Sequence, residues 1–260
     1  MARAFWQVAV GTPVELKDRD ADSTAGAPGD RAVTGAAISG MHEALLGLQT
    51  RLWAESTRSL LVVLQGIDAS GKDGTIAHVF RGLNPLGTKV ASFKEPSPAE
   101  RAHDFLWRVH ARCPAAGEFG IFNRSHYEDV LAARVRKLVD EATWRARYAH
   151  INEFESLLND AGTTVVKLFL HVSKGEQRRR LDERLADPMK RWKFKESDVA
   201  DRAKWDDYRD AFDEMLTKTS TATAPWYVVP ADHKWYRNWV VSTILVDVLT
   251  EIDPHFPNTQ

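Results

Sequence analysis

The sequence is poor in cysteine, in long apolar runs and in net charge. Its single cysteine, Cys113, excludes an intramolecular disulfide and is typical of a protein from a reducing compartment. No apolar run approaches the roughly 18 residues that a membrane-spanning helix requires, and no apolar leader follows the N-terminus. The formal charge is -1 at pH 7, so any affinity for a polyanion has to come from a local cluster of cations. These absences predict a cytoplasmic protein that binds neither nucleic acid nor membranes.

The length of 260 residues suffices for one large α/β domain. We expect residues 1–40 to form an extended or mobile N-terminal arm, because the stretch from Lys17 to Gly40 is rich in Gly, Ala, Asp and Ser and has no hydrophobic period. Residues 41–260 are expected to form the domain itself.

Strand-like apolar runs alternate with helix-like periodic segments over the rest of the chain. Strands are predicted over residues 60–65, 89–93, 119–122, 163–171 and 226–229. Helices are predicted over residues 41–54, 75–83, 98–112, 127–139, 144–160, 172–186, 197–216 and 235–249. Because this alternation is typical of parallel crossovers, it indicates an α/β fold with a central parallel sheet flanked by helices.

A glycine-bounded loop follows the first predicted strand directly. Gly66, Gly71 and Lys72 fit the spacing G-x-x-x-x-G-K. In such a loop the backbone N–H groups point inward, the next helix presents the positive end of its dipole, and the lysine reaches the outer phosphates. The pattern predicts a phosphate-binding loop. Its predicted phosphate-binding residues are Gly66, Ala69, Ser70, Gly71, Asp73 and Gly74.

The loop departs from the usual pattern at position 73, where Asp stands in place of the Ser or Thr whose hydroxyl holds Mg²⁺. Asp68 inside the loop is the nearest alternative ligand. Asn123, at the end of the strand predicted over 119–122, can coordinate through its amide oxygen but brings no charge, and Glu128 can restore that charge. We therefore predict that Asp68, Asn123 and Glu128 bind Mg²⁺, with Mn²⁺ as an alternative.

Two further basic features suit a phosphate ligand. Arg124 follows the same strand end, where its forked donors can bridge phosphate oxygens; taken alone, the Asn and Ser around it are also compatible with a simple strand-end cap. The stretch 174–195 holds nine cations and four anions, a net charge of +5 in a nearly neutral chain. A charge run is usually a solvated helix face. Arg180 and Arg184, however, lie four residues apart on one helical face and predict a phosphate-closing lid at about 174–198.

Several stretches taken together resemble a polyphosphate kinase of family 2. They occur in order from about residue 42 to the end of the chain. They read GIDASGKD, SFKEPS, HDFLWR, GIFNRSHYEDVL, HVSKGEQRRRLDERLADPMKRWKF and TSTATAPWYVVPADHKWYRNWVV.

The resemblance implies a P-loop kinase fold similar to thymidylate kinase, with a helical lid. It implies Mg²⁺-dependent transfer of a terminal phosphoryl group between inorganic polyphosphate and a nucleotide. In that family a loop aspartate, a loop lysine, a strand-end arginine and a lid arginine serve catalysis. These positions fall on Asp68, Lys72, Arg124 and Arg184.

The pair Asn123 and Glu128 resembles the third class of the family, whose members accept both nucleoside mono- and diphosphates. The implied substrates are therefore AMP, ADP and ATP, with guanine nucleotides as further candidates, and the implied assembly is a homodimer or homotetramer. Glu128 joins Asp68 as a predicted catalytic carboxylate that holds the metal or orients the acceptor phosphate. Further cations are predicted to line a groove for the polyphosphate chain. They are Lys94, Arg108, Arg134 and Arg178.

Two other functions stay open at this point. An ATP-dependent nucleoside monophosphate kinase would use the same loop and strand-end residues, and the cationic lid argues mildly against it. A non-catalytic polyphosphate- or nucleotide-binding protein would not need Lys72, Arg124 and Arg184 together.

Overall fold

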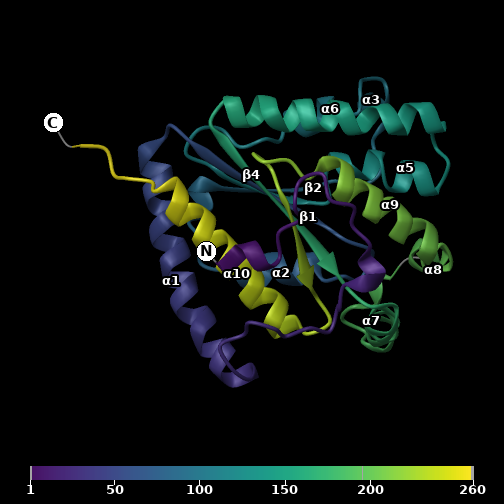
Figure 1. The fold of residues 1–260 in the computed structure, drawn as a ribbon, viewed down its shortest axis with the longest axis horizontal. Helices are drawn as coiled ribbons and strands as arrows, with labels where there is room; N and C mark the ends of the chain where they lie inside the picture. Colours follow the sequence, from purple (N-terminus) through teal and green to yellow (C-terminus); the bar gives the residue numbers. More distant parts are fainter. Residues whose placement is uncertain (1, 195, 259–260) are drawn as a thin grey trace.

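The computed structural model describes residues 2–194 and 196–258, with the backbone alone for residues 196–198. Its centre is a parallel sheet of five strands in the order β2-β3-β1-β4-β5 (Figure 1). The strands are β1 (Ser59–Gln65), β2 (Thr88–Ser92), β3 (Phe119–Asn123), β4 (Thr163–His171) and β5 (Trp226–Pro230). All five agree with the predicted strands to within two residues.

Helices cover both faces of the sheet (Figure 1). On one face α1 (Arg31–Glu55) packs along α10 (Lys234–Ile252), and on the other lie α6 (Glu141–Asp160) and α9 (Trp205–Thr219). The remaining helices are α2 (Lys72–Val79), α3 (Pro98–Arg101), α4 (Trp107–His110), α5 (Ala132–Val135), α7 (Lys174–Ala186) and α8 (Glu196–Ala203). Short 3-10 turns are η1 (Ala2–Phe5), η2 (Leu16–Asp18), η3 (Pro85–Gly87), η4 (His126–Asp129) and η5 (Arg191–Lys193). This arrangement confirms the predicted α/β class, a central parallel sheet flanked by helices.

Strand β1 occupies the centre of the sheet, and all seven of its side chains are buried. Five are apolar, and the other two, Ser59 and Gln65, form side-chain hydrogen bonds with Thr163 and Ser125. Its neighbours are β3 and β4, and the register places Leu64 beside Asn123. The loop after β1 and the loop after β3 therefore emerge at the same edge of the sheet, which is where open α/β sheets bind ligands.

The helix predicted to start at residue 41 begins ten residues earlier, at Arg31. The Asp30 side chain caps it by accepting hydrogen bonds from the backbone N–H groups of Ala32 and Val33, both at 2.9 Å. Glycines at 35 and 40 and a run of alanines hide the hydrophobic period of this first stretch. The last ten residues of the predicted arm are thus helical.

The first part of the predicted arm lies against the domain. Trp6 and Val8 are buried, and the arm pairs with β5 through a bridge between Gln7 and Tyr227. Backbone bonds join Val8 N–H to the oxygen of Trp226 and the N–H of Val228 to the oxygen of Trp6, at 2.8 and 2.9 Å. Residues 6–8 are therefore held at the edge of the sheet by these backbone bonds.

Three predicted helices are broken in the structure. The segment 98–112 forms only α3 and α4, because the Asp104 side chain accepts from the N–H groups of Leu106 and Trp107 and starts a new turn. The segment 127–139 forms η4 and α5, and Lys137 ends it with a left-handed backbone (φ 55°). The segment 197–216 is divided into α8 and α9 at Lys204.

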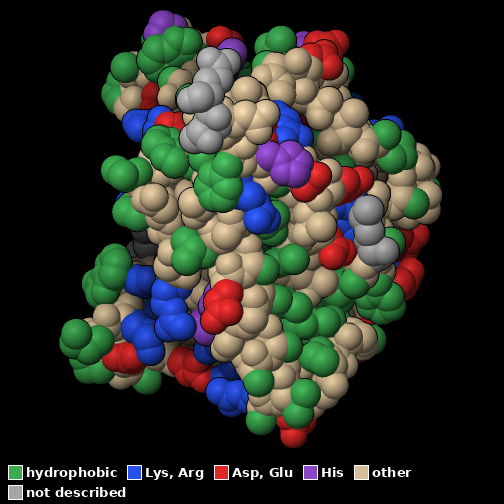
Figure 2. Space-filling model, turned by 90° about the vertical axis from the view of Figure 1, so that its left-hand side faces the viewer, with side chains coloured by type: hydrophobic (Ala, Val, Ile, Leu, Met, Phe, Trp, Pro, Cys, Tyr) green, Lys and Arg blue, Asp and Glu red, His purple; other side chains and the backbone are tan. Residues whose placement is uncertain are grey.

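The side of the molecule that α1 occupies shows apolar, basic and acidic side chains interspersed (Figure 2). Side chains of both charge signs therefore occur on this face. Within the described residues, no helix is both long and apolar enough to span a bilayer.

A buried ionic network joins β4 to α6, to η4 and to the end of α9. The Lys167 ammonium, which is fully buried, donates to Glu155 Oε2 at 2.6 Å, to the Tyr127 hydroxyl at 3.0 Å and to the backbone oxygen of Thr219. Glu155 also contacts His126 Nε2 at 3.2 Å. Because Tyr127 and His126 belong to the loop after β3, this network fixes the loop that carries the polar residues of the strand end.

We predict that Lys167→Met lowers the free energy of unfolding by about 3–5 kcal/mol, because the Glu155 carboxylate stays buried without its cation. Lys89→Met is the control, since Lys89 is exposed and its ion pair with Glu118 (2.7 Å) should contribute about 0–1 kcal/mol. Urea unfolding of both variants measures the difference. Equal losses would contradict the stabilising role of the buried network.

Candidate active site

The predicted phosphate-binding loop connects β1 to α2 at the carboxyl edge of the sheet. Its backbone has positive φ angles at Gly66 (146°), Ala69 (64°) and Gly71 (107°). A Cβ atom at Gly66 would lie 2.7 Å from the backbone oxygen of Leu170, and one at Gly71 would lie 2.0 Å from Arg237 Nη1. The backbone angle therefore favours glycine at both positions, and at Gly66 the backbone oxygen of Leu170 also leaves no space for a side chain.

Lys72 is the buried cation of this loop, with 7% of its surface exposed. Its ammonium group donates to the backbone oxygens of Gly66 (2.6 Å) and Ile67 (3.2 Å) and to Ser70 Oγ (3.4 Å). Burial, followed by the nearby Arg124 guanidinium, lowers the pKa of Lys72 to about 8. The lysine is thus held at the loop with a pKa well below its ordinary value.

Arg124 links the loop after β3 to the phosphate-binding loop. Its guanidinium forms an ion pair with Asp68, and Nη1 lies 3.8 Å from Glu128 Oε2. Arg124 itself has a left-handed backbone (φ 61°), which turns its side chain back across the strand end, and its N–H donates to the backbone oxygen of Leu64 at 3.0 Å. Four of the five predicted catalytic residues, Asp68, Lys72, Arg124 and Glu128, therefore meet at one edge.

The two carboxylates have opposite pKa shifts. Burial acts to raise the pKa of Asp68, but Arg124, Lys72 and Arg184 together outweigh it, and the pKa lies below its ordinary value. For Glu128 burial prevails over Arg124 and Lys72, and its pKa is raised. Opposite shifts of neighbouring carboxyl groups are typical of catalytic sites.

Asp73, the residue that departs from the usual loop pattern, bridges two elements. Its Oδ1 accepts from the Asn123 side-chain amide at 2.8 Å, and its Oδ2 lies 3.1 Å from the Lys193 ammonium in η5. Position 73 therefore connects the strand end that carries Asn123 to the predicted lid.

A cavity of about 450 Å³ opens beside these residues. Its lining includes the predicted residues Gly66, Asp68, Lys94, Arg108, Arg124 and Glu128. Arg108 is 8% exposed and lies with its guanidinium 5.6 Å from the centre of the Phe93 ring, where Nη1 donates to the backbone oxygen of Lys94 at 2.8 Å. The volume and the mixture of apolar walls with a few cations suit a nucleotide-sized ligand.

Two of the predicted groove cations lie elsewhere. Arg134 pairs with Glu214 at 2.6 Å and stacks over Trp144, and Arg178 is exposed and pairs with Asp182. Neither lines the cavity of about 450 Å³.

Arg136, two residues beyond Arg134, does line the cavity. It pairs with Asp201 at 2.6 Å, and sequence reasoning missed it because the helix predicted over 127–139 is broken. Tyr208 and Arg101 also line the cavity and were missed, since no motif marks them.

The two predicted lid arginines have different environments. Arg180 is buried and donates to the backbone oxygens of four residues while pairing with Glu176 at 2.7 Å. Those four are Ala69, Ser70, Ala231 and Asp232. Arg184 lies one turn later and lowers the pKa of Asp68, so its charge acts on the catalytic cluster. Arg180 thus braces the outer side of the phosphate-binding loop through its carbonyl groups.

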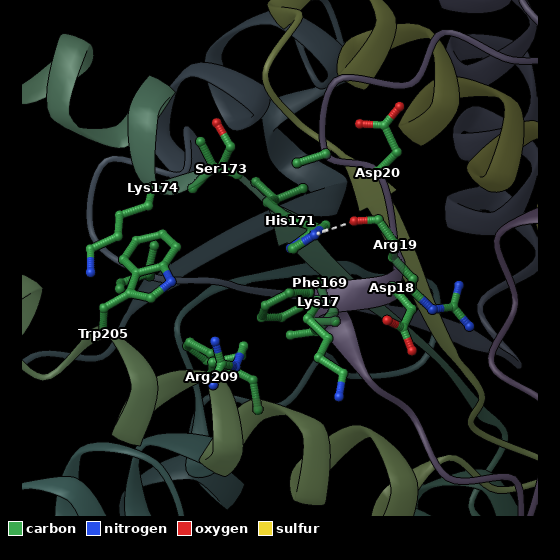
Figure 3. Close-up of a pocket in the computed structure, with 16 residues that line it drawn as sticks. Lys17, Asp18, Arg19, Asp20, Phe169, His171, Ser173, Lys174, Trp205 and Arg209 are labelled. Atoms are coloured by element: carbon green, nitrogen blue, oxygen red, sulfur yellow. Dashed lines mark hydrogen bonds between the residues drawn. The ribbon is translucent and has the colours of Figure 1, made fainter.

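A second cavity, of about 440 Å³, shares the lining residues Ile67 and Phe212 with the first. Figure 3 shows Phe169 and Trp205 beside it, and His171 Nε2 donating to the backbone oxygen of Arg19 at 2.9 Å. Its lining residues in the described part of the chain include none of the predicted catalytic side chains. The cavity of about 450 Å³ is therefore the candidate active site.

The donor set of the site suits a hard divalent cation. Asp68 and Glu128 offer carboxylate oxygens and Asn123 an amide oxygen, while no group of three His, Cys, Asp or Glu side chains converges among the described residues. Mg²⁺ commonly takes only one or two protein carboxylates and completes its shell with phosphate oxygens and water. The residues thus fit a metal that arrives with a phosphorylated substrate.

The comparisons with known proteins agree with this chemistry. The family model described as Polyphosphate kinase 2 matches residues 30–257. An "AMP/ADP-polyphosphate phosphotransferase" of Meiothermus ruber is 51% identical over 246 residues, which are 95% of this chain and 92% of the relative. An "ADP-polyphosphate phosphotransferase" of Rhodopseudomonas palustris is 43% identical over 229 residues, covering 84% and 79%.

The solved structures agree as well. The crystal structure of Polyphosphate Kinase 2 from Arthrobacter aurescens TC1 superimposes with a TM-score of 0.95 at 43% sequence identity, over 99% of this chain and 92% of that one. Sequence and fold therefore match one family over nearly the whole length, and the chain belongs to the polyphosphate kinase 2 family.

Proposed function

We propose that this enzyme transfers a terminal phosphoryl group between inorganic polyphosphate and adenine nucleotides. With polyphosphate as the donor, it converts AMP to ADP and ADP to ATP. The observation that carries the proposal is the convergence of Lys72, Arg124, Asp68 and Glu128 on one sheet edge, in a chain of the polyphosphate kinase 2 family. The relative named for both AMP and ADP supports the two acceptors.

In the forward step an oxygen of the acceptor phosphate attacks the terminal phosphorus of the polyphosphate. A new P–O–P bond forms, the bridging P–O bond to the donor breaks, and the electron pair leaves with the chain, which is shorter by one phosphate. Lys72 and Arg124 neutralise the oxygens of the transferred group, and Arg184 adds its charge from the lid. Positioning and neutralisation suffice, since phosphoryl transfer needs little covalent assistance.

We assign the metal to Asp68 and Glu128, with Asn123 as a neutral ligand. A bound Mg²⁺ would neutralise phosphate charge and align the donor and acceptor oxygens. Mn²⁺ as a replacement, a cytoplasmic location and a homodimeric or homotetrameric assembly stay predictions.

The rival function is a nucleoside monophosphate kinase with ATP as the donor. We predict that the purified enzyme makes ADP and then ATP from AMP, Mg²⁺ and polyphosphate without added ATP, and that Lys72→Ala reduces the rate on the order of 10³-fold while the protein stays folded. Chromatographic quantification of the nucleotides measures both. Product formation from AMP only when ATP is supplied would replace our proposal with the rival one.

The lowered pKa of Lys72 predicts a pH-dependent affinity for the donor. A bound polyanion stabilises the charged lysine and raises its pKa, so binding near pH 8 takes up protons. Affinity should fall as pH rises above 8, by up to about tenfold per pH unit for one linked proton. Calorimetric titration of polyphosphate in buffers of different ionisation enthalpy measures the uptake. The variant Lys72→Met should lose this component, and an identical proton uptake in that variant would assign it to another group.

The charge of Glu128 is predicted to matter more for AMP than for ADP. The α-phosphate of AMP lies one phosphate unit closer to the nucleoside, so it needs help from a well-placed metal or carboxylate to reach the donor. Glu128→Gln, which keeps the shape, should lower the rate with AMP at least about tenfold more than the rate with ADP. Steady-state rates with both acceptors give the ratio. An unchanged ratio together with a lowered melting temperature would reduce Glu128 to a structural role.

A further inference from the structure

Arg237 is a buried cation that no motif of the catalytic mechanism uses. It lies in the first turn of α10, with 3% of its surface exposed. Its Nε and Nη2 donate to the side-chain oxygen of Asn238, at 3.2 and 2.8 Å. In the described part of the chain no carboxylate forms an ion pair with it.

The surroundings of Arg237 add positive charge. Its Nη1 lies 2.0 Å from the position that a Cβ atom would take at Gly71, and its Nη2 lies 3.6 Å from the position that a Cβ atom would take at Gly74. Arg237 thus touches the first turn of α2, whose N-terminus carries partial positive charge, and it lies at the N-terminus of its own helix as well. Arg180 lies close enough that, after burial, its charge is the second cause that lowers the pKa of Arg237, to about 9.

Neighbouring Arg180 shows what a structural arginine looks like in this place. It donates to four backbone oxygens and pairs with Glu176 at 2.7 Å, so its charge and its donors are satisfied. Arg237 bonds only to a neutral amide. An unpaired buried charge usually destabilises a fold, so its presence here points to a role in binding an anion.

We propose that Arg237 is a second layer of positive charge behind the phosphate-binding loop, which strengthens the binding of polyphosphate through the loop without contacting the polymer. The inference rests on the proposed function, because it takes polyphosphate as the ligand. The positive potential of Arg237 reaches the loop through Gly71 and Gly74, in a buried region where charge is weakly screened. The unpaired charge destabilises the free enzyme, and binding of the polyanion reduces this destabilisation.

This role predicts two effects of opposite sign in one variant. Arg237→Met keeps the length of the side chain and removes the charge, so the free enzyme should melt about 3 °C higher. The same variant should bind polyphosphate about tenfold more weakly, since one unit charge acts across several ångströms of protein. Its KM for polyphosphate should rise by a similar factor while kcat at saturating polyphosphate stays within about twofold.

Three further variants serve as controls. Arg237→Lys keeps the charge and should hold the affinity within about threefold. Arg180→Met should lower the melting temperature, because it leaves Glu176 and the backbone oxygens without their partner. Arg145→Met removes the same charge from an exposed arginine that pairs with Glu141 and Glu214, and it should leave the affinity unchanged.

The test combines thermal melting without ligand with calorimetric titration of linear polyphosphate into the wild type and the four variants. A higher melting temperature and weaker binding in Arg237→Met, with recovery in Arg237→Lys, is the expected result. If Arg237→Met melts at a lower temperature than the wild type, or binds polyphosphate as tightly as the wild type does, the role of Arg237 is wrong but the proposed function stands. Absence of polyphosphate binding in the wild type would overturn the proposed function and this inference together.

Discussion

The site depends on holding several cations together against their mutual repulsion. Lys72 is buried, the Arg124 side chain is about one-third exposed, and both cations lower the pKa of Asp68. Asp68 and Glu128 make this possible, because each places a carboxylate beside Arg124. The balance leaves the site with donors that are charged, ordered and already oriented, and such preorganisation is the main way in which a protein stabilises a phosphoryl transfer.

The parallel sheet supplies the framework for this balance. Two loops that lie far apart in the sequence meet because β1 and β3 are neighbours. The hydrogen bond from the Arg124 N–H to the backbone oxygen of Leu64 fixes the position of one loop relative to the other. The buried pair of Lys167 and Glu155 then fixes Tyr127, which belongs to the second loop. Polar side chains thus order the structure in two places. One network lies in the core, away from the substrate, and the other lies at the edge of the sheet.

Local sequence determined what could be predicted. The loop from Gly66 to Lys72 was recognisable because its glycine spacing, its preceding strand and its following helix are all contiguous in the chain. The strands were found because their apolar runs are short and uninterrupted. The first helix was underestimated at its start, where glycine and alanine obscure the period that Asp30 nevertheless caps.

Long-range packing determined the rest. Arg134 and Arg136 are alike in the sequence, but Arg134 lies inside the short helix α5, Arg136 follows its end, and only Arg136 lines the cavity. Arg237 lies more than 150 residues from the loop that it touches, so no spacing rule connects them. The catalytic roles assigned to the site residues stay predictions.

The pairing of the N-terminal segment with β5 has a consequence for solubility. Strand β5 is the last strand of the sheet, and an uncovered edge offers unpaired N–H and C=O groups to any other chain. Residues 6–8 satisfy part of that edge with backbone bonds on both sides of Gln7. At the opposite edge β2 is short and carries Lys89, a charge that discourages strand addition. The N-terminal segment thus protects this edge of the sheet from pairing with another chain.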